Sequence, residues 1–111
     1  MKTEELKNLN GFRLINEGSH LNDEISTPFC CDLLSVAMNH ASEGCAWVTV
    51  MANMNTLAVA SLTDCACVIL ACGSMFDEAS LAKATEQGIT VFATDLEIFE
   101  AAMEVYKLLN A

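Results

Sequence analysis

The feature that most constrains this chain is a regular alternation of strand-like and helix-like segments from residue 44 to the C-terminus. Short runs of aliphatic and β-branched residues predict strands at 46–50, 66–71 and 89–93. The intervening and final segments predict helices at about 55–63, 78–87 and 96–109. Such alternation is typical of parallel βαβ units.

Residues that favour helix ends support this alternation. Gly88 follows the second of the three helices, where a glycine commonly ends a helix. Each of the three helices also has a polar residue near its start that we predict as its N-cap, namely Asn55, Asp77 and Asp95.

The N-terminal part of the chain has a less regular pattern. Thr3 is expected to cap a short helix that reaches Leu9, and residues 12–16 are expected to form a strand. After a polar loop and an extended segment, Asp32 is predicted to cap a helix that ends at Gly44. We therefore expect α/β class, as a single three-layer α/β/α domain over residues 1–111 with a mostly parallel sheet, since 111 residues suffice for one core and not for two.

The charge balance argues against nucleic acids and anionic lipid surfaces as partners. Fifteen acidic and five basic residues give a formal net charge of −10, which repels phosphate groups. The basic residues are scattered and form no patch: they are Lys2, Lys7, Arg13, Lys83 and Lys107.

Two segments bear on location. The N-terminal residues are charged and lack the apolar run of a secretory signal, which predicts a cytoplasmic protein. The segment 44–63 has no charge and is about as long as a membrane span, but Asn53, Asn55 and several hydroxyl residues interrupt it. We interpret it as a buried strand followed by a helix.

Two of the predicted helices have more apolar surface than a small layered domain can bury. The helix at 96–109 carries apolar residues over about half of its circumference. The helix at 55–63 has no charge on any face. We expect a second copy of the chain to cover such a surface and predict a homodimer; the alternative is a monomer with a weakly apolar surface.

Six cysteines raise the alternative of a metal or iron–sulfur site. No Cys-x-x-Cys pair occurs, but strict alternation along the strand at 66–71 would place Cys65 and Cys67 on one face, with Cys72 at the strand end. The simpler interpretation is that these are buried structural thiols. Disulfides are not expected in the cytoplasm, and we predict no cofactor.

Catalytic patterns are sparse. His20 lies in a polar loop and His40 near the end of a predicted helix, and neither has a clear nucleophile nearby. The chain has no Walker-type loop with its lysine and no Gly-x-Gly-x-x-Gly sequence after a strand. The sequence therefore favours a non-catalytic role.

Polar residues gather where α/β sheets often bind ligands, at the carboxyl ends of the strands. We propose as candidate ligand-binding residues Asn53, Asn55, Gly73, Ser74, Thr94 and Asp95. The alternative is that they only cap helices and turn the chain.

Nearly the whole chain resembles the DRTGG domain family. The matching residues are Asp32-Leu33-Leu34-Ser35, His40-Ala41, Gly44, Ala46-Trp47-Val48-Thr49, Asn55, Ala58-Val59-Ala60, Val68-Ile69-Leu70, Gly73, Gly88-Ile89 and Thr94. The resemblance implies a fold similar to the N-terminal domain of HPr kinase/phosphorylase, in a stand-alone form. It also implies regulation and dimerisation, as in family members found beside CBS domains in pyrophosphatases.

The segment that names the family departs from its pattern. Counted back from Asp32, the Asp-Arg-Thr-Gly-Gly region falls on residues 22–28, where the arginine and both glycines are missing and Pro28 stands instead. Proline fixes φ and removes a hydrogen-bond donor, which argues against a ligand role for this loop.

Together these observations predict a non-catalytic, homodimeric regulatory module. It would sense a small metabolite, with nucleotides among the candidates, or dock on a metabolic enzyme. The alternative is a cysteine-based metal or iron–sulfur accessory protein.

Overall fold

The computed structural model describes all residues, 1–111, and places every strand in one five-stranded sheet. The strand order is β1-β5-β4-β3-β2. β1 (Phe12–Asn16) pairs antiparallel with β5 (Val91–Thr94), and the other neighbours pair in parallel. The remaining strands are β2 (Pro28–Cys30), β3 (Ala46–Thr49) and β4 (Cys67–Leu70).

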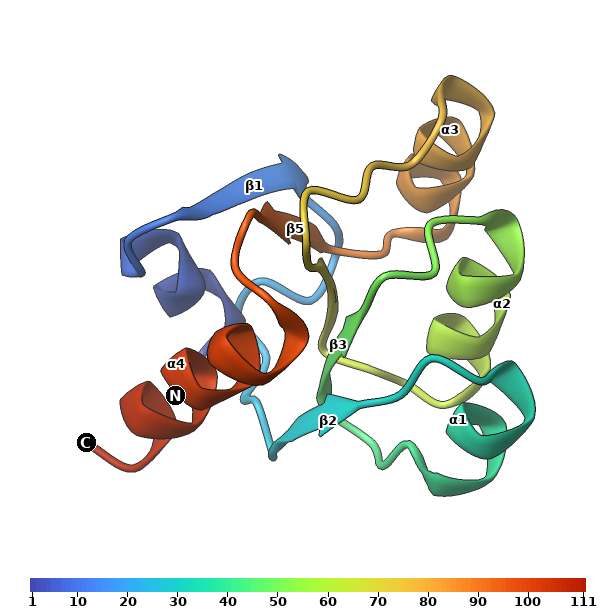
Figure 1. The fold of residues 1–111 in the computed structure, drawn as a ribbon. Helices are drawn as coiled ribbons and strands as arrows, with labels where there is room; N and C mark the ends of the chain where they lie inside the picture. The colour runs from blue at the N-terminus through green and yellow to red at the C-terminus, as the bar shows by residue number, and fades with distance from the viewer.

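Helices cover both faces of the sheet, as Figure 1 shows. One face carries α1 (Leu34–His40), α2 (Met54–Leu62) and α3 (Glu78–Gln87). The other carries α4 (Ile98–Leu109) and the 3-10 helix η1 (Thr3–Asn8). The predicted three-layer α/β/α architecture with a mostly parallel sheet is confirmed.

A hydrophobic core fills each gap between the layers. Every residue of β3, β4 and β5 is buried, as expected for parallel strands that are covered on both faces. Val48, Ile69 and Phe92 point to the layer of α4 and η1, whereas Trp47 and Val68 point to the layer of α1, α2 and α3. Most of these core side chains are aliphatic, in keeping with the low aromatic content of 6%.

The predicted caps are only partly right. Asp77 caps α3 by accepting a hydrogen bond from the Ser80 N–H, and Gly88 ends that helix in the left-handed conformation. The prediction for Asn55 is wrong because the Asn53 side chain accepts from the Asn55 and Thr56 N–H groups, so that α2 begins earlier.

Three further caps differ from the prediction. Asp95 precedes a short loop, and Glu97 is the N-cap of α4. Thr3 lies inside η1, and its buried hydroxyl donates to the Asp23 carbonyl. The Asp32 carboxylate bonds to β3 instead of to the first turn of α1.

Helix length and hydropathy also bear on the uncharged segment 44–63. It forms β3 and α2, and none of the helices is long and apolar enough to span a bilayer.

Candidate functional site

The structure brings the predicted ligand-binding residues to one edge of the sheet, at the carboxyl ends of β3, β4 and β5. Ser74 and Gly73 follow β4, Asp95 follows β5, and Asn53 and Asn55 lie at the start of α2. The chain leaves β4 toward α3 on one face and leaves β5 toward α4 on the other. Such a divergence is the place where α/β sheets commonly bind ligands.

Backbone hydrogen bonds join the loop after β4 to the end of β5 and the loop that follows it. The Gly73 N–H donates to the Thr94 carbonyl at 3.1 Å, and the Cys72 N–H donates to the Leu96 carbonyl at 2.8 Å. The Thr94 hydroxyl is buried and accepts from the Leu96 N–H. Asp95 is exposed and lies 3.8 Å from the Arg13 guanidinium.

The six residues therefore form a rim and not an enclosed pocket. Neither of the two hollows in the structure is lined by any of them. Asn53 and Asn55 make no hydrogen bond to the group around Gly73 and Thr94. A ligand at this rim stays a prediction.

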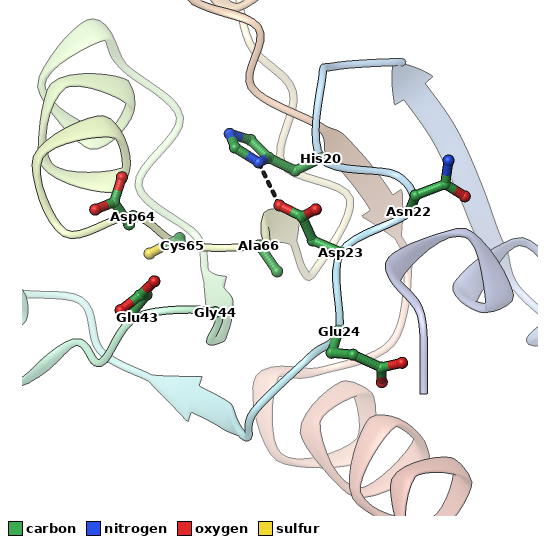
Figure 2. Close-up of a pocket in the computed structure, with 9 residues that line it drawn as sticks. All are labelled: His20, Asn22, Asp23, Glu24, Glu43, Gly44, Asp64, Cys65 and Ala66. Carbon is green, nitrogen blue, oxygen red and sulfur yellow. Dashed lines mark hydrogen bonds and ion pairs between the residues drawn. The ribbon is translucent and has the colours of Figure 1, made fainter.

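The larger hollow, of about 500 Å³, lies at the opposite edge of the sheet and was not predicted. Figure 2 shows its walls, which come from three loops before β2, β3 and β4. Its lining residues are His20, Asn22, Asp23, Glu24, Glu43, Gly44, Asp64, Cys65 and Ala66. We call it the acidic hollow. The sequence contains a signal that could have found this hollow. Glu24, Glu43 and Asp64 each stand three or four positions before a parallel strand, and the amino ends of parallel strands lie next to one another.

The charges of the acidic hollow are incompletely neutralised. Glu24 pairs with the N-terminal ammonium group, and Asp23 accepts from His20 Nδ1 at 2.6 Å. Glu43 and Asp64 form no ion pair. The hollow therefore repels anions and offers no phosphate site.

Cys65 lies in the wall of this hollow and contacts a second thiol. Its Sγ is 3.4 Å from the Sγ of the buried Cys45 and 3.3 Å from the Thr63 hydroxyl. The hydrogen bond with the Cys45 side chain lowers the pKa of Cys65 against the opposing effect of burial. The same contact, followed by burial, raises the pKa of Cys45.

The predicted grouping of Cys65, Cys67 and Cys72 is wrong. Cys65 packs in the core beside α2 and α3, whereas Cys67 packs in the core on the other side of the sheet. The alternation fails because Cys65 precedes β4 and follows Asp64, whose φ is positive at 55°. Cys72 is exposed at the far end of β4, and no three Cys, His, Asp or Glu side chains are placed to hold a metal ion.

The histidines form no nucleophilic arrangement. His20 bonds only to Asp23, and His40 is exposed in the last turn of α1. No serine or cysteine side chain makes a hydrogen bond to either ring.

The smaller hollow, of about 300 Å³, lies on the outer surface of α4. Apolar residues one turn apart form this surface, with Phe99 73% exposed and Tyr106 53% exposed. We call the surface of Leu96, Phe99, Met103 and Tyr106 the α4 face. Charged residues beside its hollow are Glu100, Glu104 and Lys107.

A second apolar surface lies on the layer of α1 and α2. Leu33, Val36 and Met38 are exposed at α1, and Met54 and Leu62 are exposed at the two ends of α2. Their exposure agrees with the sequence prediction that α2 leaves an uncharged surface uncovered. This surface has no hollow.

Comparison with known proteins finds a likeness of fold. No family model matches the chain, and no curated protein matches it. Solved structures do match, among them the CBS and DRTGG domains of the regulatory region of Clostridium perfringens pyrophosphatase, complexed with activator, diadenosine tetraphosphate, with a TM-score of 0.74 and 13% identity. The match covers 92% of this chain and 44% of that one. The chain thus has a DRTGG-like fold and spans less than half of the matched regulatory region.

Proposed function

We propose that this chain is a non-catalytic regulatory module that acts as a homodimer joined through the α4 face. The observation that carries the proposal is the exposure of Phe99 and Tyr106, about two turns apart on one side of α4 with Met103 between them, beside a hollow of about 300 Å³ that Phe99 and Met103 line. Contiguous exposed aromatic and aliphatic residues with a polar rim are typical of protein interaction surfaces.

The shape of the α4 face favours a second copy as its occupant. Phe99 borders the hollow that Leu96 and Met103 also line. Under a two-fold axis near Met103, each Phe99 can enter the hollow of the other subunit, as an isologous interface requires. The exposed aromatic ring would then supply the apolar burial.

The charge order along α4 supports the same pairing. Glu97 and Glu100 lie at the start of α4, and Lys107 lies in its last turn, where it contacts Glu104 at 3.9 Å within the same chain. Two copies of α4 packed antiparallel would bring Lys107 of each subunit near Glu100 of the other. Each pair would offset part of the repulsion between two subunits of charge −10.

Sedimentation velocity of the wild type and two matched variants tests this assembly. We expect a dimer for the wild type, a monomer for Phe99→Asp, and a dimer for Leu62→Asp, which places the same charge on the other apolar surface. Circular dichroism should show the same helix content in all three proteins. A dimer that survives Phe99→Asp and dissociates in Leu62→Asp would refute the α4 interface.

The regulatory part of the proposal rests on the fold. The matched protein is the regulatory region of an enzyme and binds a nucleotide activator. For this chain we propose a small metabolite, with nucleotides as the first class to test, or docking on a metabolic enzyme. The free thiols of all six cysteines favour a cytoplasmic setting.

The carboxyl-end rim is the proposed place for such a ligand. Arg13 is the one basic side chain that contacts it, through Asp95, so we expect a nucleotide to need Mg²⁺ to offset its phosphate charge. Isothermal titration of ATP, AMP and diadenosine tetraphosphate, each with Mg²⁺, tests this. Binding that is lost in Asn53→Ala and Asp95→Ala supports the rim; no heat with any of the three would leave docking on an enzyme as the proposed role.

A further inference from the structure

We infer that Cys45 and Cys65 form a dithiol oxidation site that neutral peroxides reach through the acidic hollow. The inference is independent of the dimer, because both thiols belong to one chain and lie on the sheet edge away from the α4 face. The observation that carries it is the contact between the two Sγ atoms at 3.4 Å, with Cys65 in the wall of a hollow of about 500 Å³.

The backbone holds the two cysteines in register. Cys45 stands one residue before β3, and its carbonyl accepts from the Ala66 N–H at 2.8 Å. One residue earlier, the Gly44 N–H donates to the Asp64 carbonyl at 2.8 Å. A disulfide needs a sulfur separation of about 2.05 Å, so the two sulfur atoms must move closer than their present 3.4 Å.

Cys65 is the one cysteine that lines the hollow. Cys45 and Cys67 do not line it and are fully buried, Cys67 on the other side of the sheet. The Cys45 thiol contacts the Cys65 sulfur at 3.4 Å, and a thiol proton placed there stabilises the Cys65 thiolate, which is the nucleophilic form. The Thr63 hydroxyl also contacts this sulfur, but it donates its proton to the Val59 carbonyl. Cys65 is therefore the attacking thiol and Cys45 the resolving thiol.

The walls of the hollow select the oxidant by charge. Glu43 and Asp64 flank Cys65 without ion-pair partners, so an anionic oxidant such as glutathione disulfide is repelled. Hydrogen peroxide is small and neutral and meets no such barrier.

The reaction balances in two steps. The Cys65 thiolate attacks one oxygen of hydrogen peroxide, an S–O bond forms, the O–O bond breaks, and the departing hydroxide takes up a proton to become water. Cys45 then loses its proton and attacks the sulfur of the Cys65 sulfenic acid, an S–S bond forms, and the S–O bond breaks to release a second water. The two thiols are oxidised by two electrons in total, and the peroxide is reduced.

The decisive experiment treats the full-length, reduced protein with hydrogen peroxide and maps the thiols. Tryptic cleavage leaves all six cysteines in the single fragment 14–83, so tandem mass spectrometry with differential alkylation must assign them. We expect the fragment to lose two hydrogen atoms and to show Cys45 linked to Cys65. Cys72→Ser, which removes an exposed thiol, should behave like the wild type.

Two variants separate the steps. Cys45→Ser should leave a Cys65 sulfenic acid that a cyclic diketone probe traps, and Cys65→Ser should leave Cys45 reduced. Oxidation of Cys30 or Cys72 in the wild type, while Cys45 and Cys65 stay reduced, would overturn the inference. This test needs only the wild-type protein, so it holds even if a variant fails to fold. Compared with the wild type, the double variant Glu43→Gln/Asp64→Asn should react faster with glutathione disulfide and equally fast with hydrogen peroxide. If the ratio of these two reaction rates is the same in the variant and the wild type, the selection of the oxidant by charge is overturned.

Discussion

The Asp32 carboxylate accepts a hydrogen bond of 2.7 Å from the Thr49 hydroxyl and so joins the end of β2 to the end of β3. The same oxygen accepts from the Val50 N–H at 2.9 Å. Thr49 is fully buried, and its hydroxyl has no other acceptor. The two loops at this edge are therefore held by one side chain that the sequence suggested as a helix cap.

Asp32→Ala should destabilise the fold by about 1–3 kcal/mol, because it leaves the buried Thr49 hydroxyl without an acceptor. Urea unfolding followed by the fluorescence of Trp47, the single and fully buried tryptophan, measures this loss. In the Thr49→Val background, Asp32→Ala should cost less, since no hydroxyl is orphaned. An equal loss of unfolding free energy in both backgrounds would show that the hydrogen bond from Thr49 to Asp32 does not stabilise the fold.

Reversing the charge of Lys107 on α4 should weaken the dimer, and reversing that of Glu100 as well should restore it. Lys107→Glu should weaken the dimer by about two- to thirtyfold, at roughly 0.2–1 kcal/mol for each of the two exposed pairs that the two-fold axis creates, and Glu100→Lys added to it should restore affinity. Sedimentation equilibrium at low salt measures the dissociation constant. Lys83→Glu is the control, because it makes the same charge change on α3, where Lys83 likewise pairs with an acidic residue three positions away.

The N-cap of α3 should make stability depend on pH. Hydrogen bonds from Ser80, first from its backbone, lower the pKa of Asp77 below its ordinary value of 3.8. A lowered folded-state pKa adds stability that is present above 3.8 and is lost as the pH falls through the folded-state value. Urea unfolding of the wild type at neutral and acidic pH should show this loss.

The matched control for this loss is Asp77→Asn, which keeps a capping oxygen and does not titrate. Its free energy of unfolding should fall less than that of the wild type over the same pH range. An identical fall in the two proteins would assign the acid sensitivity to other carboxylates.

Gly18→Ala should be among the most damaging single substitutions on the surface loops. A Cβ at this position would lie 2.3 Å from the Gly88 carbonyl oxygen and 2.5 Å from the Thr90 nitrogen. Because both atoms belong to backbone, the loop must move, and we expect a loss of about 1–3 kcal/mol. Thermal unfolding checks this, and an unchanged midpoint would mean that the 17–20 loop packs less closely than the structure shows.

The fold was largely predictable because local and long-range preferences agree. Helix α3 begins and ends where expected, since Asp77 and Gly88 are the sole strong capping residues at its two ends. Predictions failed where several polar residues compete. Asn53 and Asn55 are both good caps, and only the surrounding chain decides that Asn53 accepts the hydrogen bonds.

The site was less predictable because it depends on contacts between distant residues. Cys45 and Cys65 are twenty positions apart, and their approach follows from the register of β3 against β4, which periodicity does not specify. The acidic hollow likewise combines loops around residues 24, 43 and 64. The six predicted residues do lie at the carboxyl ends of the strands, where a ligand stays a prediction, but the hydrogen bond from Gly73 to Thr94 could not be read from the sequence.

Native mass spectrometry of the reduced wild-type protein over a range of concentrations tests the central claim of a homodimeric regulatory module most directly. We predict that the main species has twice the chain mass of 12.0 kDa and that the Phe99→Asp variant has the single chain mass. A wild-type protein that stays monomeric at every concentration would contradict the account.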